Sequence, residues 1–99
     1  MDTPPPEIQI EIDEPTAKGL YTNLALISHS ETEFVLDFTF LQPQPRKAKV
    51  HTRIITSPVH AKRFLWALQD NLRKFETRFG EIQAGRPPQE GSKPVDFYQ

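Results

Sequence analysis

Residues 46–82, RKAKVHTRIITSPVHAKRFLWALQDNLRKFETRFGEI, join a strand pattern directly to an amphipathic helix pattern. Ser57 is a favoured N-cap, because its hydroxyl can accept a hydrogen bond from a free backbone N–H group of the first helical turn. Pro58 follows at the first helical position, where a missing N–H does no harm. Gly80 suits the left-handed C-cap that ends many helices. These residues predict a helix over residues 58–79.

One face of this predicted helix is apolar. Its apolar residues recur in steps of three and four, which places them in one stripe along the helix. The stripe consists of Ala61, Phe64, Leu65, Leu68, Leu72, Phe75 and Phe79. At about 1.5 Å per residue the helix would be roughly 33 Å long. We expect the stripe to cover the apolar face of a sheet.

Four segments before the helix have the two-residue period of β-strands. They are residues 7–13, 20–28, 33–41 and 46–56. Short connections favour antiparallel pairing between neighbours in the chain. We therefore expect an α+β fold of order β-β-β-β-α, in which a four-stranded antiparallel β-meander is followed by one long C-terminal α-helix packed across the sheet.

The length of 99 residues predicts one small domain. We expect a disordered N-terminus at residues 1–6, a single α+β domain at 7–82 and a flexible C-terminal tail at 83–99. The aromatic end of the tail, Val95–Gln99, is either a short docking motif or a frayed terminus. A domain this small gains stability from association, so we expect a homodimer or a larger homo-oligomer.

Several classes of site and location are disfavoured by composition. Cysteine is absent, which excludes disulfides and thiolate metal sites. The chain shows neither a classical signal peptide nor an apolar run long enough to span a membrane. We expect a cytoplasmic protein with no membrane partner and no cofactor.

Catalytic and metal sites are disfavoured by the placement of the histidines, His29, His51 and His60. Catalysis would need one of them beside a nucleophile and a third group that orients it. Ser57 is already assigned as a helix cap, and His51 and His60 lack the helical spacing of a metal site. We expect that the protein is not an enzyme.

Charge is divided unevenly along the chain. Residues 1–45 hold eight acidic residues and one basic residue, whereas residues 46–79 hold nine basic and two acidic residues. Such a split can mark a nucleic-acid surface. The alternative is that acidic and basic strands lie side by side and neutralise each other.

Basic residues alternate along the fourth predicted strand, and this expected surface comprises Lys47, Lys49, His51 and Arg53. Tyr21 is a candidate stacking ring for the same sheet face, because single-strand binders combine basic grooves with exposed aromatic rings. Glu33 and Asp37 of the neighbouring strand would instead pair with these cations. Both readings remain open, and charge pairing is the one we favour.

Trp66 lies about 160° from Leu68 around the predicted helix, at roughly 100° per residue. It is therefore opposite the apolar stripe. The residues near it on this side, together called the Trp66 line, are Val59, Arg63, Trp66 and Arg73. An exposed tryptophan ringed by cations is typical of an oligomer or partner interface. The alternative is that lysine and arginine stems simply cover the ring.

The order of these motifs resembles a small prokaryotic family, the domain of unknown function 3467. The resemblance covers residues 8–82 and is carried by Tyr21-x-Asn23, Ser28-His29-Ser30, Glu33-Phe34-x-Leu36-Asp37-Phe38 and Val50-His51-x-Arg53-Ile54-Ile55-x-Ser57-Pro58-x-His60-Ala61-Lys62-Arg63. It continues through Ala67-Leu68-x-x-Asn71-Leu72, Phe75-Glu76 and Phe79-Gly80. The family implies no activity and no active-site residues.

The function that we expect is that of a non-catalytic homo-oligomeric binding or assembly module, with an unknown protein as a further partner. The alternative is a single-stranded DNA- or RNA-binding protein that uses the basic sheet face. The predicted strand and helix order is similar to that of Whirly-type and coactivator-type single-strand binders, but this likeness is one of architecture alone.

Overall fold

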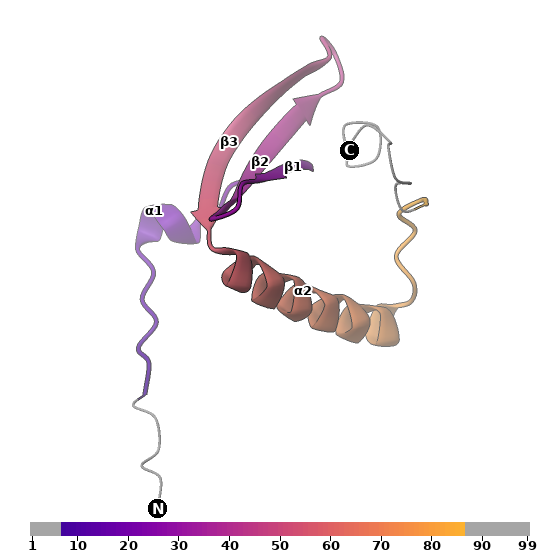
Figure 1. Ribbon diagram of the computed structural model, residues 1–99. Helices are drawn as coiled ribbons and strands as arrows, with labels where there is room; N and C mark the ends of the chain where they lie inside the picture. Colours follow the sequence, from indigo (N-terminus) through magenta and orange to yellow (C-terminus); the bar gives the residue numbers. More distant parts are fainter. Residues whose placement is uncertain (1–6, 87–99) are drawn as a thin grey trace, which may run out of the picture.

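The computed structural model describes residues 7–86 (Figure 1). Its elements are α1 (Glu14–Ala17), β1 (Leu24–His29), β2 (Phe34–Gln42), β3 (Lys47–Thr56) and α2 (Pro58–Phe79). The strands form one antiparallel sheet in the order β1-β2-β3. The α+β class and the C-terminal helix are therefore confirmed. The prediction of four strands is wrong, because residues 7–86 contain three.

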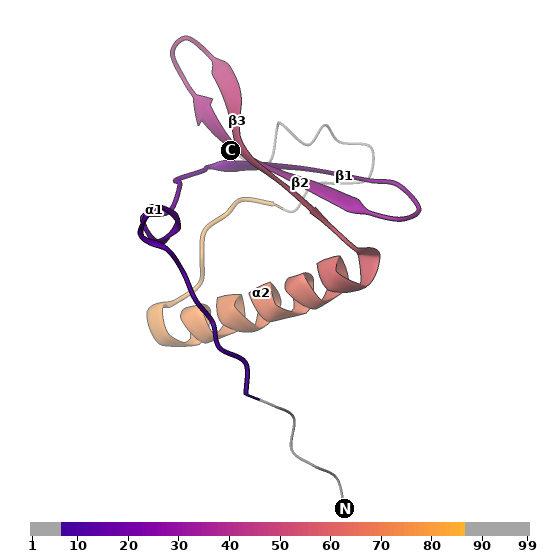
Figure 2. The ribbon, with the colours of Figure 1, turned by 90° about the vertical axis from the view of Figure 1, so that its left-hand side faces the viewer.

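The missing strand is residues 7–13, which pair with no strand among the described residues. After them the chain enters α1, a single helical turn. Asp13 caps this turn by accepting a hydrogen bond from the Thr16 backbone N–H at 2.8 Å. Gly19 leaves it at a φ of 73°, which suits glycine. The turn directs residues 7–13 away from the sheet (Figures 1 and 2).

β1 begins at Leu24, later than the predicted start at residue 20. Just before it, the Asn23 side chain bonds to the backbone of Leu41 in β2. The Leu41 N–H donates to Asn23 Oδ1 at 2.7 Å, and Asn23 Nδ2 donates to the Leu41 carbonyl at 3.1 Å. The Asn23 side chain thus satisfies the backbone N–H and carbonyl of Leu41, which a longer β1 would have paired.

α2 has the predicted bounds, 22 residues from Pro58 to Phe79. The Ser57 hydroxyl accepts from the His60 backbone N–H at 3.1 Å, which confirms the N-cap. Gly80 has the expected positive φ, 99°, and its N–H donates to the Glu76 carbonyl at 2.9 Å. Its ψ of 168° lies outside the left-handed helical region, so the predicted cap geometry is only partly correct.

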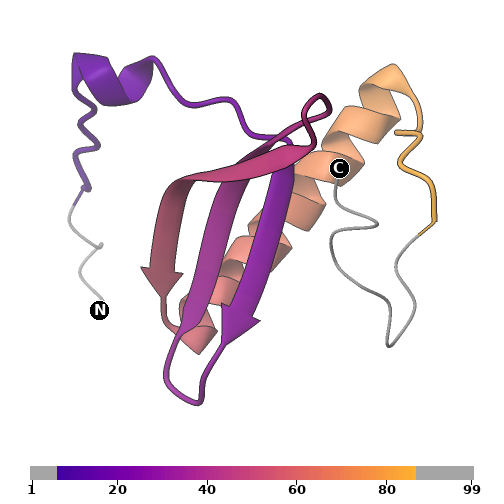
Figure 3. The same cartoon turned by 90° about the horizontal axis from the view of Figure 1, so that it is seen from above.

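α2 runs beneath one face of the sheet, and its C-terminal half extends past the β1 edge (Figure 3). The buried residues of the described chain are Leu24, Leu36 and Thr39. No residue of α2 is buried. The predicted packing of the helix across the sheet is therefore incomplete in a single chain, because a sheet of three strands leaves much of the helix without a surface to cover it.

No helix between residues 7 and 86 has the length and apolar character needed to cross a membrane. The predicted cytoplasmic location stays a prediction. Residues 1–6 and 87–99, including the docking motif predicted at Val95–Gln99, lie outside the described residues.

Candidate interaction surfaces

The apolar stripe of α2 is the largest exposed apolar feature of the helix. Its large side chains are between 42% exposed, at Leu72, and 65% exposed, at Phe79. The Phe75 and Phe79 rings contact each other with centroids 5.0 Å apart. Single exposed apolar residues are ordinary, but a continuous stripe of them marks an interaction surface.

A groove of about 530 Å³ separates the first half of the stripe from the sheet. The helix side is lined by Pro58, Ala61, Lys62, Phe64, Leu65 and Leu68, and the sheet side by Ile27, Phe34 and Leu36. The strand register places the three sheet residues on one face, because Ile27 pairs with Leu36 and Phe34 lies two residues from Leu36. The groove is thus apolar on both walls.

The second half of the stripe borders another hollow, of about 480 Å³, that has no sheet wall. It is lined by Leu68, Asn71, Leu72, Lys74, Phe75, Arg78, Phe79 and Ile82. The stripe therefore has one half that faces its own sheet across a gap and one half that faces solvent. The sequence predicted the stripe but placed it in the core.

The Trp66 line lies on the other side of α2, as predicted. Trp66 is 56% exposed, and Lys62 Nζ lies 5.7 Å from the centroid of its ring. Val59 is also exposed. The Lys62–Trp66 contact is a cation–π pair within the helix, which agrees with the reading of a cation stem over the ring. The assignment of this line to an interface stays a prediction.

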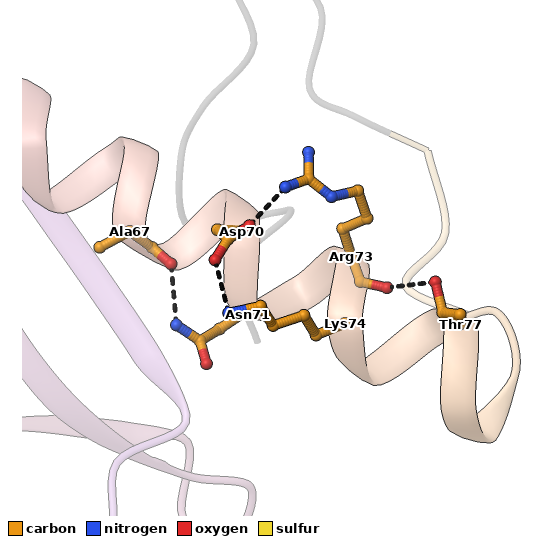
Figure 4. A network of polar contacts seen from close by, with 6 residues as sticks. All are labelled: Ala67, Asp70, Asn71, Arg73, Lys74 and Thr77. Atoms are coloured by element: carbon orange, nitrogen blue, oxygen red, sulfur yellow. Dashed lines mark hydrogen bonds and ion pairs between the residues drawn. The ribbon is translucent and has the colours of Figure 1, made fainter.

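Arg73 of the Trp66 line belongs to a polar network on α2 (Figure 4). The Asp70 carboxylate accepts from Arg73 Nη2, and Lys74 Nζ lies 2.9 Å from its other oxygen. Hydrogen bonding and charge from Lys74, with a smaller effect of Arg73, lower the pKa of Asp70. The guanidinium of Arg73 is therefore partly engaged within its own helix.

β3 contains a β-bulge that the regular alternation of its sequence does not show. Phe38 pairs with Thr52, and the next residue, Thr39, pairs with Val50, so His51 has no partner in β2. Side chains alternate between the two faces of a sheet, so an extra residue in one strand shifts the residues beyond it to the opposite face. The expectation that all four basic residues of β3 share one face is therefore wrong.

Arg53 lies on the face of β2 residue Asp37, with which it pairs. Arg53 Nε and Nη2 donate to the two carboxylate oxygens at 2.7 and 2.9 Å. These hydrogen bonds lower the pKa of Asp37 and raise the pKa of Arg53. The predicted charge pairing between neighbouring strands is thus present for Arg53. We therefore no longer count Arg53 among the candidate nucleic-acid contacts.

Lys49 pairs with Phe40 and lies on the opposite face from Arg53. The His51 ring stacks on Phe40 at 5.9 Å with an angle of 8°, and the Tyr21 ring meets Phe40 edge-on at 6.4 Å. Lys47 shares this face, because it pairs with Gln42 two residues beyond Phe40. We call Tyr21, Phe40, Lys47, Lys49 and His51 the aromatic–basic cluster. Phe40, which connects the rings, was missed as a member of this surface.

The histidines lie apart from one another. The His29 ring stacks on Phe34 at 5.3 Å, His51 stacks on Phe40, and His60 lies in the first turn of α2. Within residues 7–86 no three histidine, aspartate or glutamate residues are grouped as a metal site requires. The Ser57 hydroxyl accepts from the backbone N–H of His60 and bonds to no histidine ring between residues 7 and 86.

Comparison with known proteins gives a match to one family. The family model described as Protein of unknown function (DUF3467) matches residues 1–84. No curated protein matches the chain. No solved structure matches it either. The family match spans most of the chain, including the whole sheet and α2, and so this protein belongs to the DUF3467 family.

Proposed function

We propose that this protein is a non-catalytic homo-oligomeric assembly module in which the apolar stripe of α2 packs against a second copy. The observation that carries the proposal is the exposure of the stripe along the whole of a 22-residue helix that has no buried residue. Helices in proteins gain most of their stability from packing an apolar face. A single copy supplies little of that packing.

The stripe is suited to packing against itself in an antiparallel pair. A two-fold contact requires that one surface be complementary to itself. An axis through residue 70 would place Leu68 opposite Leu72 and Leu65 opposite Phe75. It would also place the small Ala61 opposite the large Phe79, so that helix axes could approach to about 8–10 Å. The self-complementary spacing supports a second copy as the occupant.

The positions of the histidines support the non-catalytic part of the proposal. Two of the three rings are stacked on phenylalanine rings of β2, and the third residue lies at the start of α2. General acid–base catalysis would need an imidazole within hydrogen-bond reach of a reacting group in a cleft. A further protein partner remains part of the proposal, with the Trp66 line as its candidate surface.

Sedimentation equilibrium tests the assembly. We expect a mass of at least twice the 11.4 kDa of one chain at micromolar concentrations. Leu72→Glu should give a folded monomer, because it places a charge in the part of the stripe that no sheet covers. Gln69→Glu adds the same charge outside the stripe and should remain oligomeric. A wild-type mass of one chain at tens of micromolar would contradict the proposal, and circular dichroism checks that each variant is helical.

A second candidate function is single-stranded nucleic-acid binding through the aromatic–basic cluster. The observation in its favour is that Lys47 and Lys49 lie on the face of the Tyr21, Phe40 and His51 rings and form no ion pair with any residue between 7 and 86. Base stacking on aromatic rings beside free cations is how such proteins bind single strands. We place this function second because the cluster is small.

Fluorescence anisotropy with short single-stranded DNA and RNA tests this second function. If it is correct, replacing Lys47 and Lys49 with Ala should lower the slope of log affinity against log salt by about 0.7 per lost contact. Arg53→Ala is the matched control, because Arg53 lies on the other face and should leave the slope unchanged. Absence of binding at low salt would exclude this function.

A further inference from the structure

Residues 7–13 have the sequence of a strand but pair with no strand among residues 7–86 of their own chain. Ile8, Ile10 and Ile12 alternate with polar residues, and Ile8 and Ile10 are 84% and 91% exposed. The segment leads away from the sheet of its own copy (Figures 1 and 2). Alternating isoleucines are typical of a strand that buries one face, so this segment lacks the surface that its pattern requires.

β3 offers a free sheet edge, because within the described part of the chain β2 is the one strand beside it. Lysines and bulges protect edges from further pairing, and the first half of β3 has both, at Lys47, Lys49 and His51. The second half, Thr52–Thr56, has neither. It consists of Thr, Arg, Ile, Ile and Thr, which are residues that favour strands except for the arginine. Five residues of β3 are thus open to a further strand.

An apolar hollow of about 570 Å³ adjoins this half of the edge. It lies between α1 and the sheet and is lined by Pro15, Thr16, Gly19, Leu20, Thr22, Phe38, Thr52 and Ile54. Residues directly opposite each other on paired strands lie on the same face of a sheet. In a strand added beside β3, the side chains opposite Thr52 and Ile54 would therefore enter this hollow. The hollow therefore suits the isoleucines of the unpaired segment.

Charge distinguishes the β3 edge from the β1 edge. With isoleucines in the hollow, Glu11 and its acidic neighbours Glu7 and Asp13 would lie on the Arg53 face. Arg53 is 62% exposed at its side chain and bonds Asp37 through Nε and Nη2, which leaves Nη1 for another carboxylate. β1, Leu24–His29, carries no acidic residue, lysine or arginine, so the acids would gain no ion pair there.

We propose that residues 8–12 of one copy add to residues 52–56 of a second copy as a fourth strand, with Ile10 opposite Ile54. The inference rests on the proposed function, since it needs a second copy. Asp13 fixes the direction in which the segment leaves α1, through its extended backbone and its capping bond to Thr16. The segment of one copy is thereby held away from its own β3 and available to the other.

Disulfide trapping tests this strand addition, because the chain contains no cysteine. Two proteins with tags of different size, one carrying Ile10→Cys and the other Ile54→Cys, are mixed and oxidised. We expect a cross-linked heterodimer on a denaturing gel. Ile27→Cys in place of Ile54→Cys puts the thiol on β1 and should give no cross-link with Ile10→Cys.

A second measurement covers the case in which a cysteine variant does not fold. β2 already pairs with residues 52–56 and binds every second backbone N–H there, so the test is hydrogen exchange at the other N–H groups, which face the open edge of β3 and should be protected in the wild-type protein. Replacing both Gln9 and Ile10 with Pro should remove this protection, because one of two adjacent strand residues directs its N–H at β3 and proline lacks that N–H, whereas Ile10→Val should retain it. If sedimentation shows a wild-type oligomer but neither the cross-link nor the protection is found, the strand addition is wrong and the proposed function is not affected. A wild-type monomer would overturn the proposed function with it, and a cross-link found only within one chain carrying both cysteines would show pairing in cis.

Discussion

Arg53 holds the Asp37 carboxylate through two parallel hydrogen bonds, 2.7 Å from Nε and 2.9 Å from Nη2, across neighbouring strands. Paired N–H donors on one carboxylate are the strongest geometry that arginine offers. The bulge at His51 places this pair and Lys49 on opposite faces. One basic residue of β3 is therefore neutralised within the sheet, whereas Lys47 and Lys49 form no ion pair with any residue between 7 and 86.

Asp37→Asn should alter the pH dependence of stability. Hydrogen bonds from Arg53 lower the pKa of Asp37 in the folded state below its usual value of about 3.9. A lowered pKa stabilises the fold above about pH 4, and this contribution is lost as the pH falls through the folded-state pKa. We expect the free energy of unfolding at neutral pH, measured in urea at one fixed protein concentration, to be larger for wild type than for Asp37→Asn. The difference should vanish in acid.

Glu33→Gln serves as the control for this titration, because Glu33 forms no ion pair with any residue from 7 to 86. Its stability should follow that of the wild type across the pH range. A difference between wild type and Asp37→Asn that is equal in acid and at neutral pH would show that the Arg53 pair does not set this pKa.

Asn23→Ala should destabilise the protein by about 1–3 kcal/mol, measured by urea unfolding. The Asn23 amide both accepts from and donates to the backbone of Leu41, at 2.7 and 3.1 Å, in a partly buried position. Its removal leaves two backbone groups of β2 without partners. Asn71→Ala is the matched control, because the Asn71 side chain bonds to Ala67 of its own exposed helix turn and to no other residue between 7 and 86. Alanine should be neutral or slightly stabilising there.

Ser57→Ala should cost about 1 kcal/mol, because it removes the acceptor for the His60 backbone N–H at the start of α2. Thermal unfolding followed by circular dichroism measures the loss. Ser57→Asp should restore most of the stability, since aspartate caps equally well. Failure of Ser57→Asp to recover stability would mean that the serine acts by something other than capping.

The helix was the most predictable element, because its start and end depend on nearby residues. Ser57, Pro58 and Gly80 set the bounds of α2 through local hydrogen bonds and backbone angles. The core strand β2 was also found from its alternating phenylalanines. The interactions that fix the bounds of α2 are close in the sequence, whereas β2 is held by distant partners and was identified because its local alternation alone is typical of a strand.

The bulge and the missing strand could not be predicted, because both depend on pairing between distant residues. The alternation through β3 is regular in sequence, and only the register against β2 shows that His51 is unpaired. Similarly, the isoleucines of residues 7–13 predict a strand, but their pattern does not state whether a partner strand is available to pair with them. The stripe of α2 was recognised as apolar, but a helical pattern does not state what covers it.

Trp66→Ala should leave the fold and the dimer intact and weaken only larger assemblies or binding of a further partner. The reason is the placement of Trp66 on the side of α2 opposite Leu68, where it is 56% exposed beside Lys62. A dimer formed through the apolar stripe leaves this side free. Velocity sedimentation over a concentration series should show dimers for both proteins, with fewer larger species for the variant.

The fluorescence of Trp66, the only tryptophan of the chain, gives an independent measurement. In wild type, dilution from larger assemblies to dimers should shift the emission to the red as the ring enters water. Leu72→Glu, which targets the stripe, should lower the mass to that of one chain. Dissociation of the dimer by Trp66→Ala, with retained helix content, would place the two-fold contact on the Trp66 line. Loss of helix content would instead show that Trp66 stabilises the fold of the single chain.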